Sequence, residues 1–254
     1  MKPKTLSRGT AEVRILPDLD ALSRAAADEF LRTAREAIRQ GGRFTVALSG
    51  GHTPRRLYEY LINCPQERIG ELPSEKMEIF FGDERQVVPD HAESNFRMVR
   101  ETLLANGRIP LANVHRIQGE LDPQQAADLY EAELRKCFGL APGQPPRFDL
   151  ILLGLGTDGH TASLFPGTSA LAEERRWACA NWVPKLQSHR VTLTLPVLNA
   201  GAKVVFLVSG KEKAEVLRAV LQCEDEGVKL PAQLVRPHSG RLRWLVDADA
   251  ASLL

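Results

Sequence analysis

The sequence has few cysteines, and no two of them lie at the spacing of a redox or metal motif. This pattern favours reduced thiols over a disulfide framework or a zinc site, and it predicts a cytoplasmic protein. The histidines likewise form no H-x-x-x-H pair, so we expect no essential metal. The cysteines are Cys64, Cys137, Cys179 and Cys223, and the histidines are His52, His91, His115, His160, His189 and His238.

Long hydrophobic runs and an excess of charge of one sign are also missing. No apolar run approaches the length of a membrane-spanning helix, and residues 1–5 lack the apolar core of a secretory signal. The 33 basic and 32 acidic residues give a net charge of +1. No overall field therefore favours nucleic acid or an anionic membrane as a partner, and any recognition of anions must be local. The oligomeric state stays open, with a monomer as one option.

Strands and helices alternate along the sequence. With 254 residues and 43% hydrophobic content, the chain can bury one sizeable core, so we expect a single domain over residues 1–254. The alternation predicts an α/β fold of three layers, in which a doubly wound, mostly parallel sheet has helices on both faces. We expect strands at 11–16 (an edge strand), 44–48, 77–81, 114–117, 148–153, 177–183, 191–195, 203–208 and 242–246, and helices at 19–40, 54–62, 94–105, 122–138 and 211–222.

The most informative stretch is the buried strand at 148–153 and the glycine-rich turn that follows it, G-L-G-T-D-G-H at 154–160. The turn brings Asp158 and His160 to the carboxyl end of a central strand, where open α/β sheets bind their ligands. It also matches the dinucleotide-binding pattern G-x-G-x-x-G. That reading is disfavoured because Pro166 and Gly167 interrupt the chain where the pattern requires a second strand with an acidic residue. We therefore expect no nucleotide cofactor.

A second turn, S-G-G-H-T-P at 49–54, joins the strand at 44–48 to a helix. Gly50 and Gly51 allow close approach of the backbone, and Ser49 and Thr53 supply hydroxyl groups. The free N–H groups at the start of the helix could bind a phosphate. An ordinary N-capped helix start would have the same sequence, so this alternative stays open. No G-K-[ST] follows, so nucleotide hydrolysis is not indicated.

Two further polar segments could complete an anion site. The triplet D-E-R at 83–85 ends the strand at 77–81, and Arg85 is suited to a phosphate or a carboxylate. The segment 185–190 places Lys185 and Arg190 close together in an otherwise electroneutral chain. Taken alone, a D-E-R triplet is more often a solvated strand end than a site, and the basic segment could equally be a solvated turn. With His160 and Asp158, the set suits general-base hydrolysis of a small phosphorylated substrate, and no G-x-S-x-G elbow points to a serine hydrolase.

Three motifs connect the chain to a known family. They are A-L-S-G-G-H-T-P at 47–54, F-F-G-D-E-R-Q-V-V-P at 80–89 followed by E-S-N-F at 93–96, and G-L-G-T-D-G-H-T-A-S-L-F-P-G at 154–167. In their order and spacing, and in chain length, the sequence resembles the 6-phosphogluconolactonases, over essentially its whole length. The resemblance implies the α/β fold of the sugar-phosphate isomerase/deaminase type.

The resemblance also implies an activity: cofactor-free hydrolysis of 6-phospho-D-glucono-1,5-lactone to 6-phospho-D-gluconate in the oxidative pentose phosphate pathway. His160 would take a proton from water, and Asp158 would orient His160 or bind a substrate hydroxyl. Backbone N–H groups of a glycine turn or a cationic side chain would stabilise the oxyanion. The candidates for binding the substrate are Ser49, Gly50, Gly51, Thr53, Arg85, Lys185 and Arg190.

Two alternatives remain open. The related glucosamine-6-phosphate deaminase/isomerases typically read D-E-Y where this chain has Asp83-Glu84-Arg85, and G-H-I-A-F-N-E-P where it has G-H-T-A-S-L-F-P at 159–166. Both differences favour the lactonase. A non-catalytic sugar-phosphate sensor could use the same fold and the same anion site. The histidine in the glycine turn argues against a pure binding protein, which needs no titratable group there.

Overall fold

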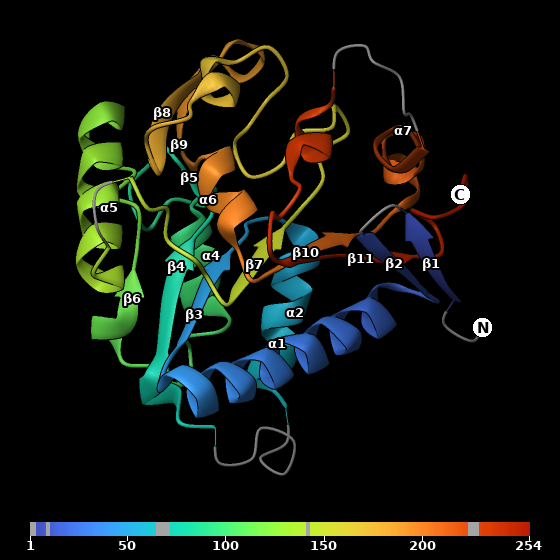
Figure 1. Cartoon of the computed structure of the whole chain (residues 1–254), viewed down its shortest axis with the longest axis horizontal. Helices are drawn as coiled ribbons and strands as arrows, with labels where there is room; N and C mark the ends of the chain where they lie inside the picture. Colours follow the sequence, from blue (N-terminus) through green and yellow to red (C-terminus); the bar gives the residue numbers. More distant parts are fainter. Residues whose placement is uncertain (1–3, 9–10, 65–71, 141–142, 223–228) are drawn as a thin grey trace.

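The large sheet of the molecule has eight strands in the order β1-β2-β11-β10-β7-β3-β4-β6 (Figure 1). The structure is a computed structural model that describes residues 4–8, 11–64, 72–140, 143–222 and 229–254. Only β1 and β2 pair antiparallel in this sheet. The strands are β1 Lys4–Arg8, β2 Ala11–Leu16, β3 Phe44–Leu48, β4 Met77–Phe81, β6 Val114–His115, β7 Leu150–Leu153, β10 Lys203–Val208 and β11 Arg241–Asp247.

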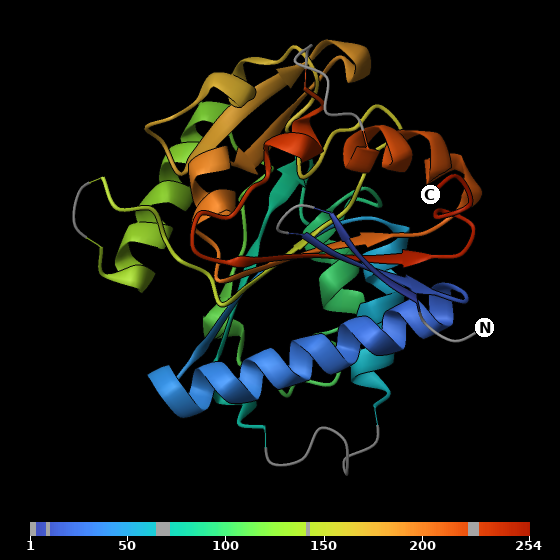
Figure 2. The same ribbon diagram turned by 45° about the vertical axis from the view of Figure 1, so that its right-hand side comes forward.

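Helices cover both faces of this sheet. Figure 2 shows α1 along one face, with α7 and a smaller sheet on the opposite side. The three-layer, mostly parallel α/β architecture expected from the sequence is therefore confirmed. None of the described helices combines the length and the apolar character needed to cross a bilayer. The helices are α1 Leu19–Gly41, α2 His52–Ile62, α4 Asn95–Glu101, α5 Pro123–Phe138, α6 Leu195–Ala200 and α7 Ala214–Gln222.

The longest helix, α1, has clear signals at both ends. The Asp18 carboxylate caps it by accepting the Ala21 N–H at 2.7 Å. Gly42 ends it with a φ of 77°, in the left-handed region that glycine adopts without strain. Between these ends a stripe at four-residue spacing is buried, so the helix packs against the sheet through one face. The stripe consists of Leu22, Ala26, Phe30 and Ala34.

A separate sheet of three antiparallel strands is the largest departure from the sequence-based prediction. Its order is β5-β9-β8, with β5 Asp83–Arg85, β8 Ala178–Val183 and β9 Ser188–Leu193. The sequence predicts strands at 177–183 and 191–195, and both are present with shifted bounds, but it does not indicate that they form a sheet of their own. The chain leaves β4 through Gly82, whose carbonyl accepts the Leu193 N–H at 2.8 Å. This pairing spans about half the chain, so no local pattern could indicate it.

The strand at 11–16 is also placed differently from the prediction. It forms β2 as expected, but it is not an edge strand, because β1 pairs along its outer side and β11 along its inner side. The edge position belongs to β1. The last strand in the sequence, β11, thus lies between β2 and β10.

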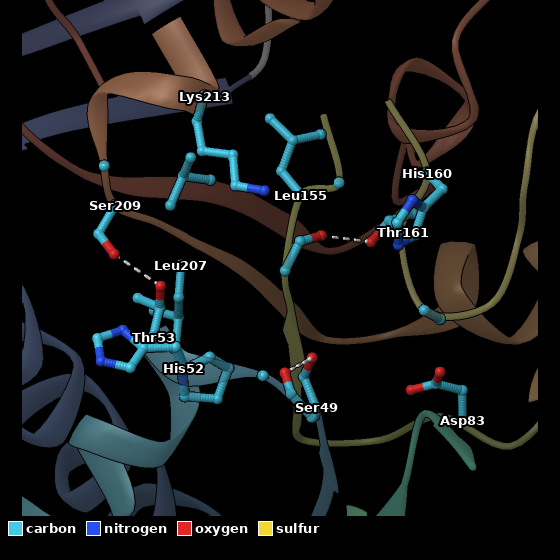
Figure 3. A pocket seen from close by; sticks show the side chains of 18 of the residues that line it. Ser49, His52, Thr53, Asp83, Leu155, His160, Thr161, Leu207, Ser209 and Lys213 are labelled. Atoms are coloured by element: carbon cyan, nitrogen blue, oxygen red, sulfur yellow. Dashed lines mark hydrogen bonds between the residues drawn. The ribbon is translucent and has the colours of Figure 1, made fainter. Parts of the chain in front are cut away.

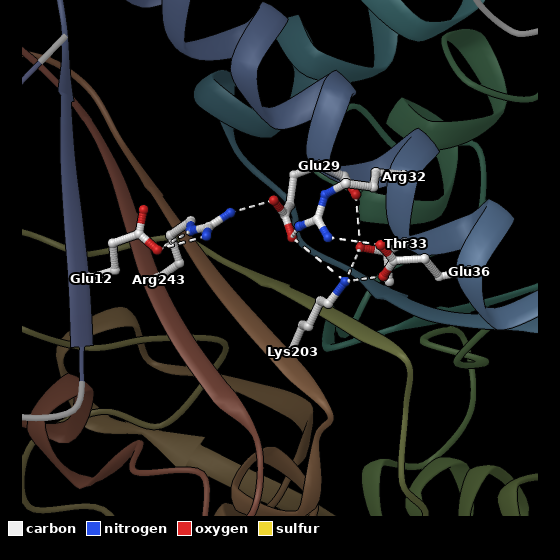
Figure 4. Close-up of polar contacts among 7 residues, drawn as sticks. All are labelled: Glu12, Glu29, Arg32, Thr33, Glu36, Lys203 and Arg243. Carbon is white, nitrogen blue, oxygen red and sulfur yellow. Dashed lines mark hydrogen bonds and ion pairs between the residues drawn. The ribbon is translucent and has the colours of Figure 1, made fainter.

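A network of charged side chains joins α1 to β2, β10 and β11 (Figure 4). Its centre is Glu29, which is only 8% exposed and pairs with Arg243 and, at 2.6 Å, with Arg32. Arg243 also contacts Glu12 at 2.6 Å, and Lys203 contacts Glu36 at 2.8 Å. Removing a buried carboxylate that has several cationic partners lowers the free energy of unfolding. The partners remain charged, but they lose their counter-ion in a region from which water is largely excluded.

We expect Glu29→Ala to lower the free energy of unfolding by about 3 kcal/mol, because it leaves Arg243 and Lys203 without their buried partner. Urea unfolding followed by circular dichroism measures the change. The matched control is Glu36→Ala, which removes a carboxylate that is 37% exposed on the same helix and should cost less than about 1 kcal/mol. Equal losses in the two variants would contradict a central role for Glu29.

Candidate active site

A cavity of about 560 Å³ opens at the carboxyl edge of the large sheet. Its walls come from the turns that follow β3, β7 and β10, together with β5 and the start of α4. This is the edge at which open α/β sheets bind ligands. The two polar turns singled out in the sequence, at 49–54 and 154–160, converge there with the D-E-R triplet at 83–85.

The structure distributes the nine candidate site residues over two groups. Asp158, Lys185 and Arg190 do not line the cavity. Asp158 contacts His160 and Arg190 pairs with Arg85, both of which line it, whereas Lys185 contacts Asp158. The residues that line it directly are Ser49, Gly50, Gly51, Thr53, Arg85 and His160.

The His160 imidazole is oriented by Asp158. Its Nδ1 atom lies 2.5 Å from Oδ1 of Asp158, and the Lys185 ammonium lies 3.1 Å from Oδ2. Burial opposes ionisation of this carboxyl, but the hydrogen bond from His160, its charge and the Lys185 contact lower the pKa of Asp158 to about 2. Asp158 is therefore ionised at neutral pH, so Nδ1 of His160 is the donor. In the neutral imidazole, Nε2 is then the free basic nitrogen.

The backbone of the turn is shaped around the same imidazole. The Phe165 ring stacks on it with centroids 4.0 Å apart and planes at 21°. On the other side, a Cβ atom at Gly156 would lie only 2.0 Å from Nδ1, so this position requires glycine. Ala162, which lines the cavity, has a φ of 46°, an uncommon value for a residue with a side chain. These contacts fix the position of the ring.

The opposite side of the cavity is the start of α2. Gly51 precedes the helix with a φ of 101°, and no side chain caps its first N–H groups. The Thr53 hydroxyl lies 2.7 Å from that of Ser209, just after β10. Figure 3 shows Thr53, Ser209 and the Lys213 side chain on one side of the cavity and His160 on the other. A helix start with free N–H groups, two hydroxyls and an ammonium are groups of the kind that bind phosphates.

Lys213 and Ser209 were not among the candidates from the sequence. The available signal was the apolar run at 204–208, which ends at Ser209-Gly210 at the same sheet edge. The sequence predicts one helix over 211–222, whereas Lys213 lies in a 3₁₀ turn, Lys211–Lys213, before α7. It forms no ion pair with any residue that the structure describes.

Asp83 and Glu84 have different roles although they are adjacent. Asp83 is buried, lines the cavity and accepts hydrogen bonds from Ser163 Oγ at 2.6 Å and Asn95 Nδ2 at 3.3 Å. The Glu84 carboxylate accepts the N–H groups of Asn95 and Phe96 at the start of α4, each at 2.8 Å. Burial raises the pKa of Glu84 in spite of these bonds. Glu84 thus holds α4 in place and does not reach the cavity.

Arg85 lies beside Arg190, its neighbour across the β5–β9 pair. Arg85 donates to the Glu93 carbonyl at 2.6 Å, and Arg190 donates to Ser188 Oγ at 2.8 Å. Burial and the charge of Arg85 lower the pKa of Arg190. Neither arginine pairs with a carboxylate in the part of the chain that the structure describes. Two neighbouring cations without an acidic partner favour an anion at this end of the cavity.

Comparison with known proteins identifies the family. The family model described as glucosamine-6-phosphate isomerases/6-phosphogluconolactonase matches residues 17–244. The chain belongs to this family. Among its relatives, the 6-phosphogluconolactonase of Nostoc sp. is 40% identical over 244 residues, covering 95% of this chain and 98% of the relative. The human 6-phosphogluconolactonase is 42% identical over 213 residues, covering 84% of this chain and 81% of the relative.

Solved structures of the family have the same architecture. The 6-phosphogluconolactonase from Trypanosoma cruzi superposes with a TM-score of 0.85 at 29% identity, covering 98% of each chain. A monomeric glucosamine-6-phosphate deaminase superposes with a TM-score of 0.77 at 23% identity, a level at which the comparison shows a common fold alone. The fold thus covers both branches of the glucosamine-6-phosphate isomerase/6-phosphogluconolactonase family, and the side chains of the cavity must distinguish them.

Proposed function

We propose that the chain hydrolyses 6-phospho-D-glucono-1,5-lactone to 6-phospho-D-gluconate, the step that belongs to the oxidative pentose phosphate pathway, with His160 as general base. The observation that carries this proposal is the contact between Nδ1 of His160 and the ionised Asp158. This contact leaves Nε2 as the basic nitrogen, in a cavity that also has groups suited to binding a phosphate. Relatives that are 40–44% identical to the chain are named 6-phosphogluconolactonase, which supports the same substrate.

The reaction needs one proton to move twice. Nε2 of His160 takes a proton from a water molecule as its oxygen attacks the lactone carbonyl carbon. The carbonyl oxygen becomes an oxyanion, for which Arg85 and the backbone N–H groups of the glycine turn are candidate donors. When the bond between this carbon and the ring oxygen breaks, His160 returns the proton to the ring oxygen. The product is the open-chain acid, and no cofactor takes part.

The phosphate of the substrate fits the other side of the cavity. In this arrangement it accepts hydrogen bonds from the first N–H groups of α2 and from Thr53, and it pairs with Lys213. Gly50 packs so closely on Asn95 that a Cβ there would lie 1.9 Å from the amide oxygen, so glycine is required for the turn to take this shape. Holding the phosphate here directs the lactone ring towards His160.

The competing deaminase reaction is disfavoured by the surroundings of His160. The deaminase motif G-H-I-A-F-N-E-P has a glutamate at the position of Phe165, whose ring here stacks on the imidazole. His160 accordingly has a single carboxylate partner within the described chain, which is Asp158. This environment suits one proton transfer to and from water, and it lacks a second acidic group beside the histidine.

The function is tested by following the hydrolysis of freshly generated 6-phosphogluconolactone and subtracting its spontaneous rate. Release of ammonia from glucosamine 6-phosphate is measured in parallel on the same preparation. Acceleration of lactone hydrolysis without ammonia release supports the proposal. Ammonia release without acceleration would replace the lactonase with the deaminase, and activity in neither assay would favour the sugar-phosphate sensor.

Lys213→Ala is expected to raise KM for the lactone about tenfold or more and to change kcat little, because the phosphate binds equally in the ground and transition states. Initial rates over a range of substrate concentrations separate the two constants. The matched control is Lys211→Ala, which removes an exposed ammonium from the same 3₁₀ turn that does not line the cavity. A fall in kcat at unchanged KM would show that Lys213 acts on the reacting atoms instead.

We further infer a cytoplasmic location and a single domain over residues 1–254. Free thiols at Cys64, Cys137 and Cys179 support the first, and one continuous hydrophobic cluster, from Ala11 to Ala250, supports the second. The fourth cysteine, Cys223, lies outside the described residues.

A further inference from the structure

A second group of chemically reactive side chains lies at the edge of the large sheet, away from the cavity. Glu78 of β4, His115 of the edge strand β6 and Cys137 of α5 each present one ligand atom, and these three atoms lie within 4.8 Å of one another. Glu78 is near the amino end of β4, whereas the cavity lies beyond its carboxyl end. All three residues are partly buried and none lines the cavity.

The His115 imidazole is held as metal-binding histidines usually are. Its Nδ1 lies 2.8 Å from Glu133 on α5, and its Nε2 lies 2.8 Å from Glu78. The ring stacks on Phe80 with centroids 4.2 Å apart and planes at 15°. A carboxylate on one ring nitrogen fixes the tautomer of a histidine that binds metal through the other. Glu133 has this position, and Nε2 is directed towards Glu78.

We propose that Glu78, His115 and Cys137 form a binding site for a divalent cation of the zinc class, with water as the fourth ligand. Carboxylate, imidazole and thiolate are the ligands that zinc combines in tetrahedral sites, and ligand atoms 2.0–2.3 Å from a common ion must lie close together, as these do. The site is distinct from the catalytic cavity, and it is independent of the proposed reaction.

The charged groups around the cluster suit a divalent cation with a thiolate ligand. Carboxylates of Glu78 and Glu133 lie on either side of the His115 ring. The Arg43 guanidinium, 3.7 Å from the Cys137 sulfur, would balance the charge of the thiolate.

A cation at this position would connect β4 and β6 to α5 through three direct bonds. A cation that binds the folded chain and not the unfolded chain stabilises the folded state. The expected effect of the cation is therefore on the free energy of unfolding and not on catalysis. The spacing of cysteines and histidines in the sequence does not indicate such a site, because its ligands come from three elements that only the fold brings together.

The site is tested by adding cobalt(II) to the purified, metal-free chain. Cobalt(II) replaces zinc, and a charge-transfer absorption band reports its ligation by a thiolate. We expect one equivalent to bind with this band, and zinc to raise the melting temperature. Cys137→Ser and His115→Gln should lose the band and the thermal shift. Glu133→Gln, which alters only the support of His115, should weaken cobalt binding about tenfold or more.

Two variants keep this test specific. Cys179→Ser removes a buried thiol outside the proposed metal site, and His160→Ala removes the active-site imidazole. Both variants should bind cobalt as the wild type does. The basal lactonase activity of Cys137→Ser, measured without added metal, checks that this variant folds. Absence of the band in the wild type, or its persistence in Cys137→Ser, overturns the proposal.

Discussion

Replacing His160 by alanine is expected to lower kcat/KM for lactone hydrolysis at least about 100-fold, the smaller end of the range for loss of a general base. Asp158 leaves Nε2 of His160 as the basic nitrogen, whereas His115, another imidazole with a carboxylate at Nδ1, also has a carboxylate at Nε2. The measurement is continuous titration of the acid released from fresh substrate, with the spontaneous rate subtracted. Binding of the product 6-phosphogluconate should persist in the variant, because the groups suited to binding its phosphate are intact.

A matched control for this change is His238→Ala, which removes an exposed imidazole that does not line the cavity. It should retain the wild-type rate. If His160→Ala keeps more than about a tenth of the wild-type kcat/KM, proton transfer by this residue is not the source of the acceleration. The reaction would then depend on electrostatic stabilisation of the oxyanion by groups such as Arg85.

Asp158→Asn is expected to have the second large effect, a loss of at least about 100-fold in kcat. The asparagine amide would donate to Nδ1 of His160 and place the proton on Nε2, so the basic nitrogen would face away from the attacking water. If Asp158 instead binds a substrate hydroxyl, the variant should raise KM at nearly constant kcat. Asp90→Asn, at an exposed pair with Arg100, is the control for removing one carboxylate charge.

The pH dependence of the same variant provides a second measurement. Because the pKa of Asp158 is about 2, this carboxylate is ionised across the working range and keeps its contact with Nδ1 of His160. A lowered carboxyl pKa adds stability that is present above the ordinary value of 3.8 and is lost as pH falls towards 2. Acid unfolding should therefore show a smaller pH dependence in Asp158→Asn than in the wild type over that window.

Local signals explain why much of the fold and the histidine site could be predicted from the sequence. Short, mainly apolar runs such as 44–48 and 203–208 mark strands buried on both faces, and both strands have the expected bounds. Asp158 and His160 are two residues apart in a glycine turn, so one short stretch contains both partners. Parallel strands present their carboxyl ends at one edge, which is why the turns at 49–54 and 154–160 could be placed together.

The features that sequence reasoning missed depend on contacts between distant parts of the chain. The β5–β9 pair joins residues about a hundred positions apart, and the charged triplet at 83–85 has no apolar alternation that would reveal a strand. The same pairing places Arg190 beside Arg85, which no local pattern indicates. Lys213 reaches the cavity only because β10 lies two places from β3 in the sheet. Tertiary pairing, and not local propensity, decides these positions.

The position of β11 has a consequence for how the chain is synthesised. This strand is made after the other strands of the large sheet, yet among the described residues it joins β10 to the β1–β2 pair, which is made before the other strands. While a ribosome still holds residues 241–247, β2 has no inner neighbour, and the open sides of β2 and β10 are free to pair with other chains. Completion of the sheet thus waits until residues 241–247 have left the ribosome, and chains that stop before residue 241 should be recognised by chaperones and proteases as unfinished.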